Sequence, residues 1–554
     1  MFQYIRNHSD KFIKLLWLGT ILVCIKSILT DTGFDNSYAV AMSYRHLNGD
    51  AMMQAMWELH QTSIYVTDIL MWLYHLIVPS YTGVMLYLQT CGTLLFVLLG
   101  YYLYRMLREY TGKEVGQLVW MFFILFRVKQ SPFPDYANLQ VAFSLLIILF
   151  LLRFFENQDH VSYLLAAAVC LCLGVIAYPS GVLIYLAVCV LLFWKTEKKW
   201  KNVGILTGTC ALLGSCYVGY FVWKLGLGGL LDRIGNIIGI DTHGGENSGW
   251  YTSYLFDFFL AAGWVLCCIA IAWLIKKLLS KKKTVDLLPL TGLLLVVSEV
   301  AMLLLRRKTG LDWTTTFFIV PLFLILLGAG KYSKLTDKEK TVWVTGLLIS
   351  CSCFAATLIF SDLAFITILA YLVLGGAFSF VAIRHYEGNA LVFLMAIVTL
   401  VMFHRGLVVW GYANKSDDWL VYEVESIVRS GPTVGVVCDY MTSVQIRDGA
   451  RDHATYLGPD DSVLLVGWWI MDSTEYLLLN GADICNPTVI DTPIFNENLL
   501  TYQEVNPDKV PNVVAVSCWF GNLMVDPNSW IMNWVEENYE PVGDGSYWRY
   551  YRIK

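Results

Sequence analysis

The sequence predicts a polytopic α-helical membrane protein with a small external α/β region at its C-terminal end. Hydrophobic residues occupy 57% of the 554 positions and charged residues only 15%, whereas soluble proteins carry about 25% charged residues. Long apolar runs recur over the first three quarters of the chain, as expected of membrane-spanning helices. Farther on, short β-type runs at 433–440, 461–469 and 512–520 alternate with helical stretches at 473–481 and 528–539, which is typical of an α/β fold.

The N-terminal segment places basic residues ahead of its first apolar run and has no small-residue cleavage site after it. We therefore interpret this run as an uncleaved transmembrane helix rather than as a signal peptide. About 13 apolar segments are expected in all. They span residues 12–30, 82–104, 115–128, 137–154, 161–177, 179–194, 203–223, 254–275, 286–305, 312–330, 341–360, 363–383 and 389–411.

Lys and Arg are distributed unevenly between the loops. With the N-terminus in the cytoplasm, alternate loops such as "KTEKKWK" and "KYSKLTDKEK" gather positive charge on one side. The opposite loops, such as "SPFPDYAN" and "SDLA", are nearly free of it. The positive-inside rule then predicts a multi-pass protein of the cell membrane with its C-terminal region outside the cytoplasm. The cationic "RRK" at 306–308 is an exception on the outer side.

We expect two parts, a transmembrane domain over residues 1–414 and an extracytoplasmic α/β domain over 415–554. Two outer loops, 31–81 and 224–253, are longer than plain connections usually are. In the first, a helix capped by Asp35 is expected to run to Leu47 and to stop at Asn48-Gly49. A second helix over 63–78 is expected to lie in the membrane interface.

Several classes of function find no support in the sequence. The net charge is −5 and no basic stripe is present, so nucleic acid is excluded as a partner. Most of the 14 cysteines lie inside apolar runs, and no CxxC pair or Cys/His spacing predicts a disulfide framework or zinc site. The C-terminal region lacks GxGxxG, GxxxxGK[ST] and Ser nucleophile motifs.

Two acids and a cationic turn are expected to meet at the outer membrane boundary: Asp35, Asp135, and the run Arg306, Arg307 and Lys308. This combination suits sugar transfer from a polyprenyl-phosphate donor. An acceptor hydroxyl must lose its proton as it attacks the anomeric carbon, which calls for a carboxylate base. The phosphate leaving group needs its charge stabilised, which Arg, Lys or a metal ion provides.

The segment "DNSYAVAMSYRHLNGD", 35–50, resembles the first external loop of GT-C glycosyltransferases, and "PDYANLQVAFSLL", 134–146, resembles their second. The similarity is greatest to the lipid-A aminoarabinose transferase and protein O-mannosyltransferase type. It implies a GT-C-like fold of about 13 transmembrane helices, with Asp35 as general base and Asp135 as a second functional acid. The family's frequent Asp-Glu pair is Asp-Asn here, so no role of that Glu passes to Asn36.

The alternative interpretation of these acids is a structural role. Asp35 and Asp135 can each cap a helix, a role that Ser or Asn fills equally well. Asp31 is expected to be the solvated polar end of the first helix. Tyr38 and Arg45 are further candidates for contact with the donor phosphate. Arg45 lies about 15 Å along the helix from Asp35, too far for an ion pair.

No cofactor is indicated with certainty, and a divalent metal (Mg, Mn or Zn) is the one candidate. Glu58, His60 and His243 are its possible ligands, although ordinary hydrogen bonding explains these residues as well. Such spacing of Glu and His alone is a weak metal signal.

The sequence favours a glycosyltransferase whose partners are the lipid bilayer, a polyprenyl-phosphate-linked sugar and a cell-envelope acceptor (glycan, lipid or protein). It would act on the outer face with inversion. The alternatives are a membrane transporter or flippase and a non-catalytic subunit of envelope polysaccharide assembly. Transporters place ionisable residues and related repeats near the bilayer midplane, whereas the apolar segments here look nearly free of charge.

Overall fold

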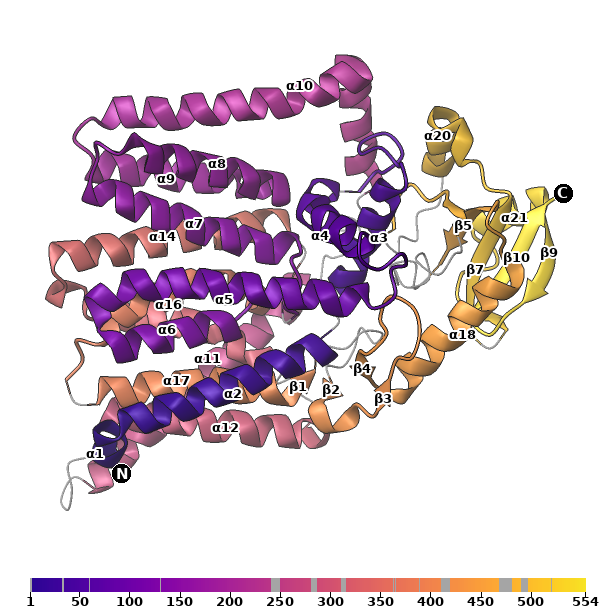
Figure 1. The fold of residues 1–554 in the computed structure, drawn as a ribbon. Helices are drawn as coiled ribbons and strands as arrows, with labels where there is room; N and C mark the ends of the chain where they lie inside the picture. Colours follow the sequence, from indigo (N-terminus) through magenta and orange to yellow (C-terminus); the bar gives the residue numbers. More distant parts are fainter. Residues whose placement is uncertain are drawn as a thin grey trace.

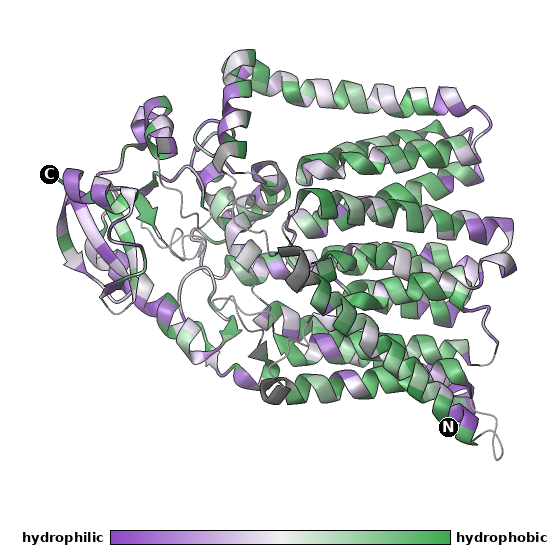
Figure 2. Cartoon of the chain, turned by 180° about the vertical axis from the view of Figure 1, so that it is seen from behind, coloured by the Kyte–Doolittle hydropathy of each residue, from purple (hydrophilic) through white to green (hydrophobic). Residues whose placement is uncertain are grey.

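The computed structural model describes residues 2–31, 34–58, 60–129, 131–240, 250–279, 286–309, 315–361, 363, 365–387, 389–409, 419–467, 481–489, 497–519 and 521–554. At 34–35, 239–240, 250–254, 306–309, 419 and 497 the backbone alone is described. The apolar helices lie side by side in one bundle, with the strand-containing region at one end and the N-terminus at the other (Figure 1). Hydrophobic residues run along the bundle, and polar residues gather at its ends and over the strand-containing region (Figure 2).

The predicted fold class is confirmed, because each predicted apolar segment coincides with a helix. Within the described ranges, nine helices are long and apolar enough to cross a membrane, and shorter apolar helices lie among them. The bundle consists of α2 (Ser9–Thr30), α5 (Val84–Thr111), α6 (Lys113–Leu125), α7 (Tyr136–Glu156), α8 (Val161–Ala177), α9 (Leu183–Lys195), α10 (Lys199–Ile240), α11 (Trp250–Leu279), α12 (Leu287–Thr309), α13 (Val320–Ala329), α14 (Asp337–Phe360), α15 (Phe365–Ile368), α16 (Val373–Ile383) and α17 (Ala390–Leu407), with α1 (Phe2–Asn7) ahead of it.

Burial separates central from peripheral helices. The apolar span Phe365–Ile383 is 94% buried inside the protein, whereas that of α10 is 11% buried, so most of α10 is left for lipid. Small residues bring the central helices close together, as is usual in membranes. A Cβ on Gly346 of α14 would lie 2.4 Å from Cγ of Phe378 on α16.

The first outer loop forms the two predicted helices. Helix α3 (Phe34–Leu47) ends where expected, before Gly49 at φ 112°. It begins two residues earlier than predicted, so Asp35 lies in its first turn rather than at its cap. Helix α4 (Tyr65–His75) exposes an apolar face, as an interfacial helix does. That face comprises Ile69, Trp72, Leu73 and Leu76.

Helix α10 extends beyond its predicted end at residue 223. It kinks at Gly226, where φ is 72°, a value that glycine adopts without strain. The chain then continues as helix to Ile240, so the start of the predicted 224–253 loop is helical. In this second part Ile237 packs against Trp57 and Tyr502, which joins α10 to the first outer loop and the C-terminal region.

The C-terminal region contains a mixed sheet in the order β6-β5-β7-β10-β9, with β8 beside β7. Strands β5 and β7 run parallel, and β10 is antiparallel to β7. The predicted strands within 461–469 and 512–520 are present as β5 and β7, and the predicted helix within 528–539 is α21. The predicted helix at 473–481 lies outside the described residues. The elements are β1 (Val408–Val409), β2 (Trp419–Leu420), β3 (Ser426–Ile427), β4 (Val437–Cys438), α18 (Tyr440–Tyr456), β5 (Ser462–Val466), β6 (Asp483–Ile484), α20 (Glu497–Val505), β7 (Val513–Trp519), β8 (Asn522–Leu523), α21 (Trp530–Asn538), β9 (Tyr539–Asp544) and β10 (Trp548–Ile553).

Candidate functional site

Ionisable side chains gather where α2 and α17 end, at the strand-containing end of the bundle. Asp31, the residue after α2, is fully buried. Its Oδ1 lies 2.7 Å from Lys26 Nζ and its Oδ2 lies 3.4 Å from Arg405 Nη2. The prediction that Asp31 is solvated is therefore wrong. Packing of α3 and α5 over the end of α2 covers the carboxylate, and two cations compensate its lost hydration.

These cations also decide the ionisation of Asp31. Burial opposes ionisation, but the charges of Lys26 and Arg405 outweigh it and hold the pKa of the Asp31 carboxyl below its ordinary value. Asp31 is therefore a carboxylate at neutral pH, committed to two partners. A group so engaged serves as a structural counter-ion rather than as a proton acceptor.

A third cation, Arg127, lies in the same buried region. Its guanidinium interacts electrostatically with Asp31 and Arg405 and lies 5.6 Å from the Phe96 ring centroid. Its Nε has no hydrogen-bond partner within the described part of the chain. Among the side chains that the structure describes, Lys26, Arg127 and Arg405 gather around the carboxylate of Asp31. A buried cluster with this many cations suits an anion, because buried charge is costly unless it is compensated.

The same cluster contacts the start of α3. Asn36 Nδ2 donates to the Asp31 carbonyl at 3.5 Å and to Ser131 Oγ at 2.6 Å, and Gln89 Nε2 donates to the Asp31 carbonyl at 2.8 Å. The first turn of α3, which carries Asp35, thus lies between the cationic cluster and the loop that leads to Asp135. The side chain of Asp35 itself is outside the described residues.

The loop before α7 is held against α5. A Cβ on Gly92 would lie 1.8 Å from the Pro132 carbonyl oxygen, so only glycine allows this approach. Asp135 is buried and caps α7, its Oδ1 accepting from Asn138 N at 2.8 Å. The capping role is thus observed, and it fixes a carboxylate at the start of α7, four residues after Ser131, which contacts Asn36 of α3.

The predicted cations at 306–308 lie in the last turn of α12, where the backbone alone is described. One turn earlier, Leu303 packs against Val408 and Leu420, directly beyond the end of α17. The backbone of 306–308 therefore lies close to the segment that carries Arg405. Arg306, Arg307 and Lys308 thus stand near the cationic cluster by position, and no contact of their side chains is described.

Aromatic rings line the adjoining region. The His60 ring stacks on Tyr136 at a centroid distance of 4.1 Å and on Tyr178 at 5.5 Å. Lys129 Nζ lies 5.4 Å from the Tyr136 centroid, within cation–π range. The buried Tyr371 side chain interacts electrostatically with Lys129 and Asp135. Parallel rings beside a cation and a carboxylate offer the stacking and hydrogen-bonding groups that a polar ring such as a sugar requires.

The other predicted phosphate ligands belong to a second buried network, which joins the first outer loop to the C-terminal region. Tyr38 donates to Glu58 Oε2 at 3.3 Å. Arg45 Nε lies 2.7 Å from Asp50 Oδ2, and its Nη2 donates to the Ala55 carbonyl at 2.8 Å. The backbone N–H of Val489 donates to Glu58 Oε1 at 2.5 Å. Arg45 is therefore largely committed to holding the loop.

The residues described do not form the predicted metal site. Both Glu58 carboxylate oxygens accept protein hydrogen bonds, and the His60 ring stacks against Tyr136 and Tyr178. His243 lies outside the described residues. Across the described ranges, no three or more His, Cys, Asp and Glu side chains gather as metal ligands do. Glu58 and His60 thus fit hydrogen bonding and stacking better than metal ligation.

Glu58 is expected to make the stability of this network depend on pH. Burial raises its pKa from 4.5 to about 7, although Arg45, Val489 and Tyr38 favour the charged form. The folded protein thus binds a proton more tightly than the unfolded chain. The contribution of Glu58 to the free energy of unfolding is then greatest below pH 4.5 and falls by about 3 kcal/mol as the pH rises through 7.

The measurement is the thermal unfolding midpoint of the detergent-purified protein between pH 5 and 8, compared with Glu58→Gln. The variant keeps an acceptor for Val489 N–H and loses the ionisable group. Its midpoint should fall less steeply with pH than that of the wild type. Equal slopes in the two proteins would assign the pH dependence to other groups.

Sequence reasoning missed the three cations of the buried cluster. Lys26, Arg127 and Arg405 each lie inside a predicted apolar segment, near the end expected to be external. Ionisable residues in membrane segments are by default functional candidates, so the signal was present. Each cation is a single charge among many apolar residues, so the segment as a whole resembles an ordinary membrane-spanning helix.

No protein-family model and no curated protein matches the chain. Among solved structures, the chain is similar to the Archaeoglobus fulgidus oligosaccharyltransferase in complex with Zn and sulfate, at 10% identity over 90% of this chain and 68% of that chain, with a TM-score of 0.45. It is also similar to ArnT from Cupriavidus metallidurans, in the apo state and bound to undecaprenyl phosphate. Each ArnT match has 11% identity over 98% of both chains and a TM-score of 0.40. These values are too low to carry an argument about activity.

Proposed function

We propose that this protein is an integral-membrane glycosyltransferase that moves a sugar from a polyprenyl-phosphate donor to a cell-envelope acceptor on the outer face. One observation carries the proposal. A buried cluster of three cations, Lys26, Arg127 and Arg405, lies at the membrane boundary beside the helix turn that holds Asp35. An anion site and a carboxylate side by side are what phosphate departure and hydroxyl activation require.

In the proposed reaction, Asp35 takes the proton of an acceptor hydroxyl, whose oxygen attacks the anomeric carbon. The bond between that carbon and the phosphate oxygen breaks, so the configuration inverts and polyprenyl phosphate leaves. Lys26, Arg127 and Arg405 stabilise the charge on the leaving phosphate, with Arg306, Arg307 and Lys308 as further cations. Asp135 orients the acceptor. In this proposal the N-terminus lies in the cytoplasm and the region from 415 onward lies outside it.

Asp35→Asn tests the base. Sugar transfer from a carrier-linked donor by the purified variant should fall about 10²- to 10⁴-fold, the usual contribution of general-base catalysis. Binding of the donor should change little, because the phosphate site is separate. Asn36→Ala is a neighbouring control, expected to disturb the turn without removing a base. Wild-type turnover by Asp35→Asn would refute the assignment of this residue.

A transporter or flippase is the second candidate, and one observation favours it. Glu299 of α12 and His404 of α17 form a fully buried pair, with Oε1 and Nδ1 2.7 Å apart. Buried ionisable pairs in membrane helices mark proton and substrate pathways in transporters. Lipid translocation by the protein reconstituted in liposomes, abolished by Glu299→Gln while Asp35→Asn remains active, would establish this function instead.

A further inference from the structure

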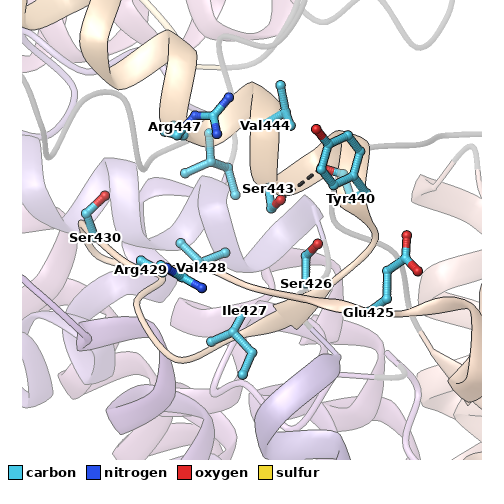
Figure 3. Close-up of a pocket in the computed structure, with 11 residues that line it drawn as sticks. Glu425, Ser426, Ile427, Val428, Arg429, Ser430, Tyr440, Ser443, Val444 and Arg447 are labelled. Carbon is cyan, nitrogen blue, oxygen red and sulfur yellow. Dashed lines mark hydrogen bonds between the residues drawn. The ribbon is translucent and has the colours of Figure 1, made fainter.

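A cavity of about 580 Å³ lies in the C-terminal region, outside the site described above. One wall is the first two turns of α18, and the other is β3 with the residues that follow it. Figure 3 shows Ser443, Val444 and Arg447 on the α18 side and Ser426, Val428 and Arg429 on the facing side. A cavity of this size is within the range of small-molecule binding sites.

The cavity combines positive charge with hydroxyl groups. Arg429 and Arg447 line it together, and Glu425 stands at the other end (Figure 3). Arg447 is engaged by Asp448, with Nε 2.9 Å from Oδ1. Arg429 forms no ion pair with any residue that the structure describes. Arginine binds phosphate through two parallel hydrogen bonds, so the arginine end suits a phosphate group.

The remaining lining suits a polyol attached to that phosphate. Ser426, Ser443 and Tyr440 present hydroxyl groups between the arginines and Glu425. A carboxylate repels a phosphate but accepts hydrogen bonds from alcohol groups. The chemistry of the cavity therefore changes from anion-binding to hydroxyl-binding along its length, which matches a glycerol phosphate.

The position of the cavity points to the membrane as the source of this group. The turn after Arg429 is bonded to the first turn of the bundle helix α5, with Gly83 N donating to the Gly431 carbonyl and Met85 N to the Pro432 carbonyl, both at 3.1 Å. Ile427 and Tyr440 on the rim are 60% and 59% exposed. Exposed aromatic and aliphatic side chains at such a boundary are typical of contact with lipid headgroups.

We propose that this cavity binds the glycerol-phosphate headgroup of an anionic lipid of the outer leaflet, and so holds the C-terminal region against the membrane. Arg429 and Arg447 contact the phosphate, and Glu425 accepts from the glycerol hydroxyls. The proposal does not depend on the transfer reaction, because none of the cavity residues belongs to the site at the end of α2.

The test uses the full chain in nanodiscs of phosphatidylcholine with added phosphatidylglycerol. Lipid retained on the protein is measured by native mass spectrometry. Arg429→Gln should lower the apparent affinity for phosphatidylglycerol about tenfold or more. Arg549→Gln, which removes an equal charge elsewhere in the C-terminal region, should leave it unchanged. Equal loss in both variants would overturn the site in favour of general electrostatic attraction.

Competition with soluble glycerol phosphate tests whether the bound group comes from a membrane lipid or from a free solute. At concentrations matched to the lipid, glycerol phosphate should fail to displace phosphatidylglycerol from the wild-type protein, because it lacks the membrane anchor. Complete displacement would overturn the membrane assignment. Glu425→Ala removes the acceptor and should narrow the preference for phosphatidylglycerol over phosphatidylmethanol, an equally charged lipid whose headgroup has no hydroxyl to donate. An unchanged preference would overturn the role given to Glu425.

Discussion

Replacing Arg405 with glutamine is expected to weaken binding of polyprenyl phosphate by about 10- to 100-fold. The estimate assumes the loss of one charge-assisted hydrogen bond to the phosphate, about 1.5–3 kcal/mol. Arg405 is 2% exposed and 3.4 Å from Asp31, so no bulk water compensates the loss. Arg405→Lys should recover only part of the affinity, because lysine lacks the planar fork that grips phosphate. Binding of undecaprenyl phosphate to purified variants, followed by native mass spectrometry, gives the comparison.

The matched variant is Asp31→Asn. The same site predicts that Asp31→Asn responds more strongly to phosphate, whereas Arg405→Gln binds phosphate more weakly. Removing the carboxylate leaves Lys26, Arg127 and Arg405 without their counter-ion, so the ligand-free protein should lose about 3–5 kcal/mol of stability. An added phosphate then supplies the missing charge. Its stabilising effect on the thermal midpoint should therefore be larger in Asp31→Asn than in the wild type.

A purely structural role predicts a different pattern. If Asp31, Lys26 and Arg405 only hold α2 against α17, both variants should lose stability and neither should change its response to phosphate. Arg549→Gln, in the C-terminal region, removes a cation outside both the cluster and the C-terminal cavity and serves as the control for net charge. A phosphate response that is equal in Arg405→Gln, Asp31→Asn and the control would remove the cluster from the proposed mechanism.

The sequence was sufficient to predict the helical bundle because lipid imposes a simple rule. A segment of about 20 apolar residues has few alternatives to a membrane-spanning helix. The end of α3 at Leu47 could also be predicted from neighbouring residues, since Gly49 adopts a positive φ that ends a helix. Both features depend on the residues nearby and on no distant contact.

Features created by distant contacts were beyond this reasoning. Asp31 appeared to be a solvated helix end because nothing near it in sequence shows that Arg405 meets it from 374 residues away. The extension of α10 to Ile240 likewise depends on packing of Ile237 against Trp57 and Tyr502. The sequence therefore predicts only part of the candidate site. The acids can be identified from local motifs, whereas the buried cations are brought together by tertiary packing of separate helices.

Substitution in the network around Arg45 is expected to have an equally large effect on stability. Arg45 is fully buried and contacts Asp50, the Ala55 carbonyl and, at 3.5 Å, the Tyr502 hydroxyl. Its Nη1 lies 4.0 Å from Glu58. Arg45→Met would remove the buried positive charge that compensates Asp50 and Glu58, leaving Asp50 with Lys509 alone and Glu58 with neutral donors only, so we expect a loss of about 3–5 kcal/mol. The loss should be local, appearing as faster amide hydrogen exchange in residues 50–58 and 497–505.

Lys509 provides a partner variant, because its Nζ lies 2.5 Å from both Asp50 and Asp483. Lys509→Met should loosen the same segments, and the double variant should cost more than the sum of the two, because only the double variant leaves the buried Asp50 without either cation. Arg552→Met removes an ion pair with Asp461 inside the C-terminal region, and should leave residues 50–58 protected.

Amide hydrogen exchange of Arg45→Met also distinguishes whether Arg45 binds the phosphate or holds the first outer loop. A direct phosphate ligand would lose donor affinity on substitution while the exchange of residues 50–58 stayed slow. A residue that holds the loop would lose that protection first, and sugar transfer would fall because α3 and its Asp35 are no longer fixed against the bundle. The contacts of Arg45 support the second outcome: its Nε and Nη2 are already bonded within the protein, so a phosphate would have to compete with Asp50 for the guanidinium.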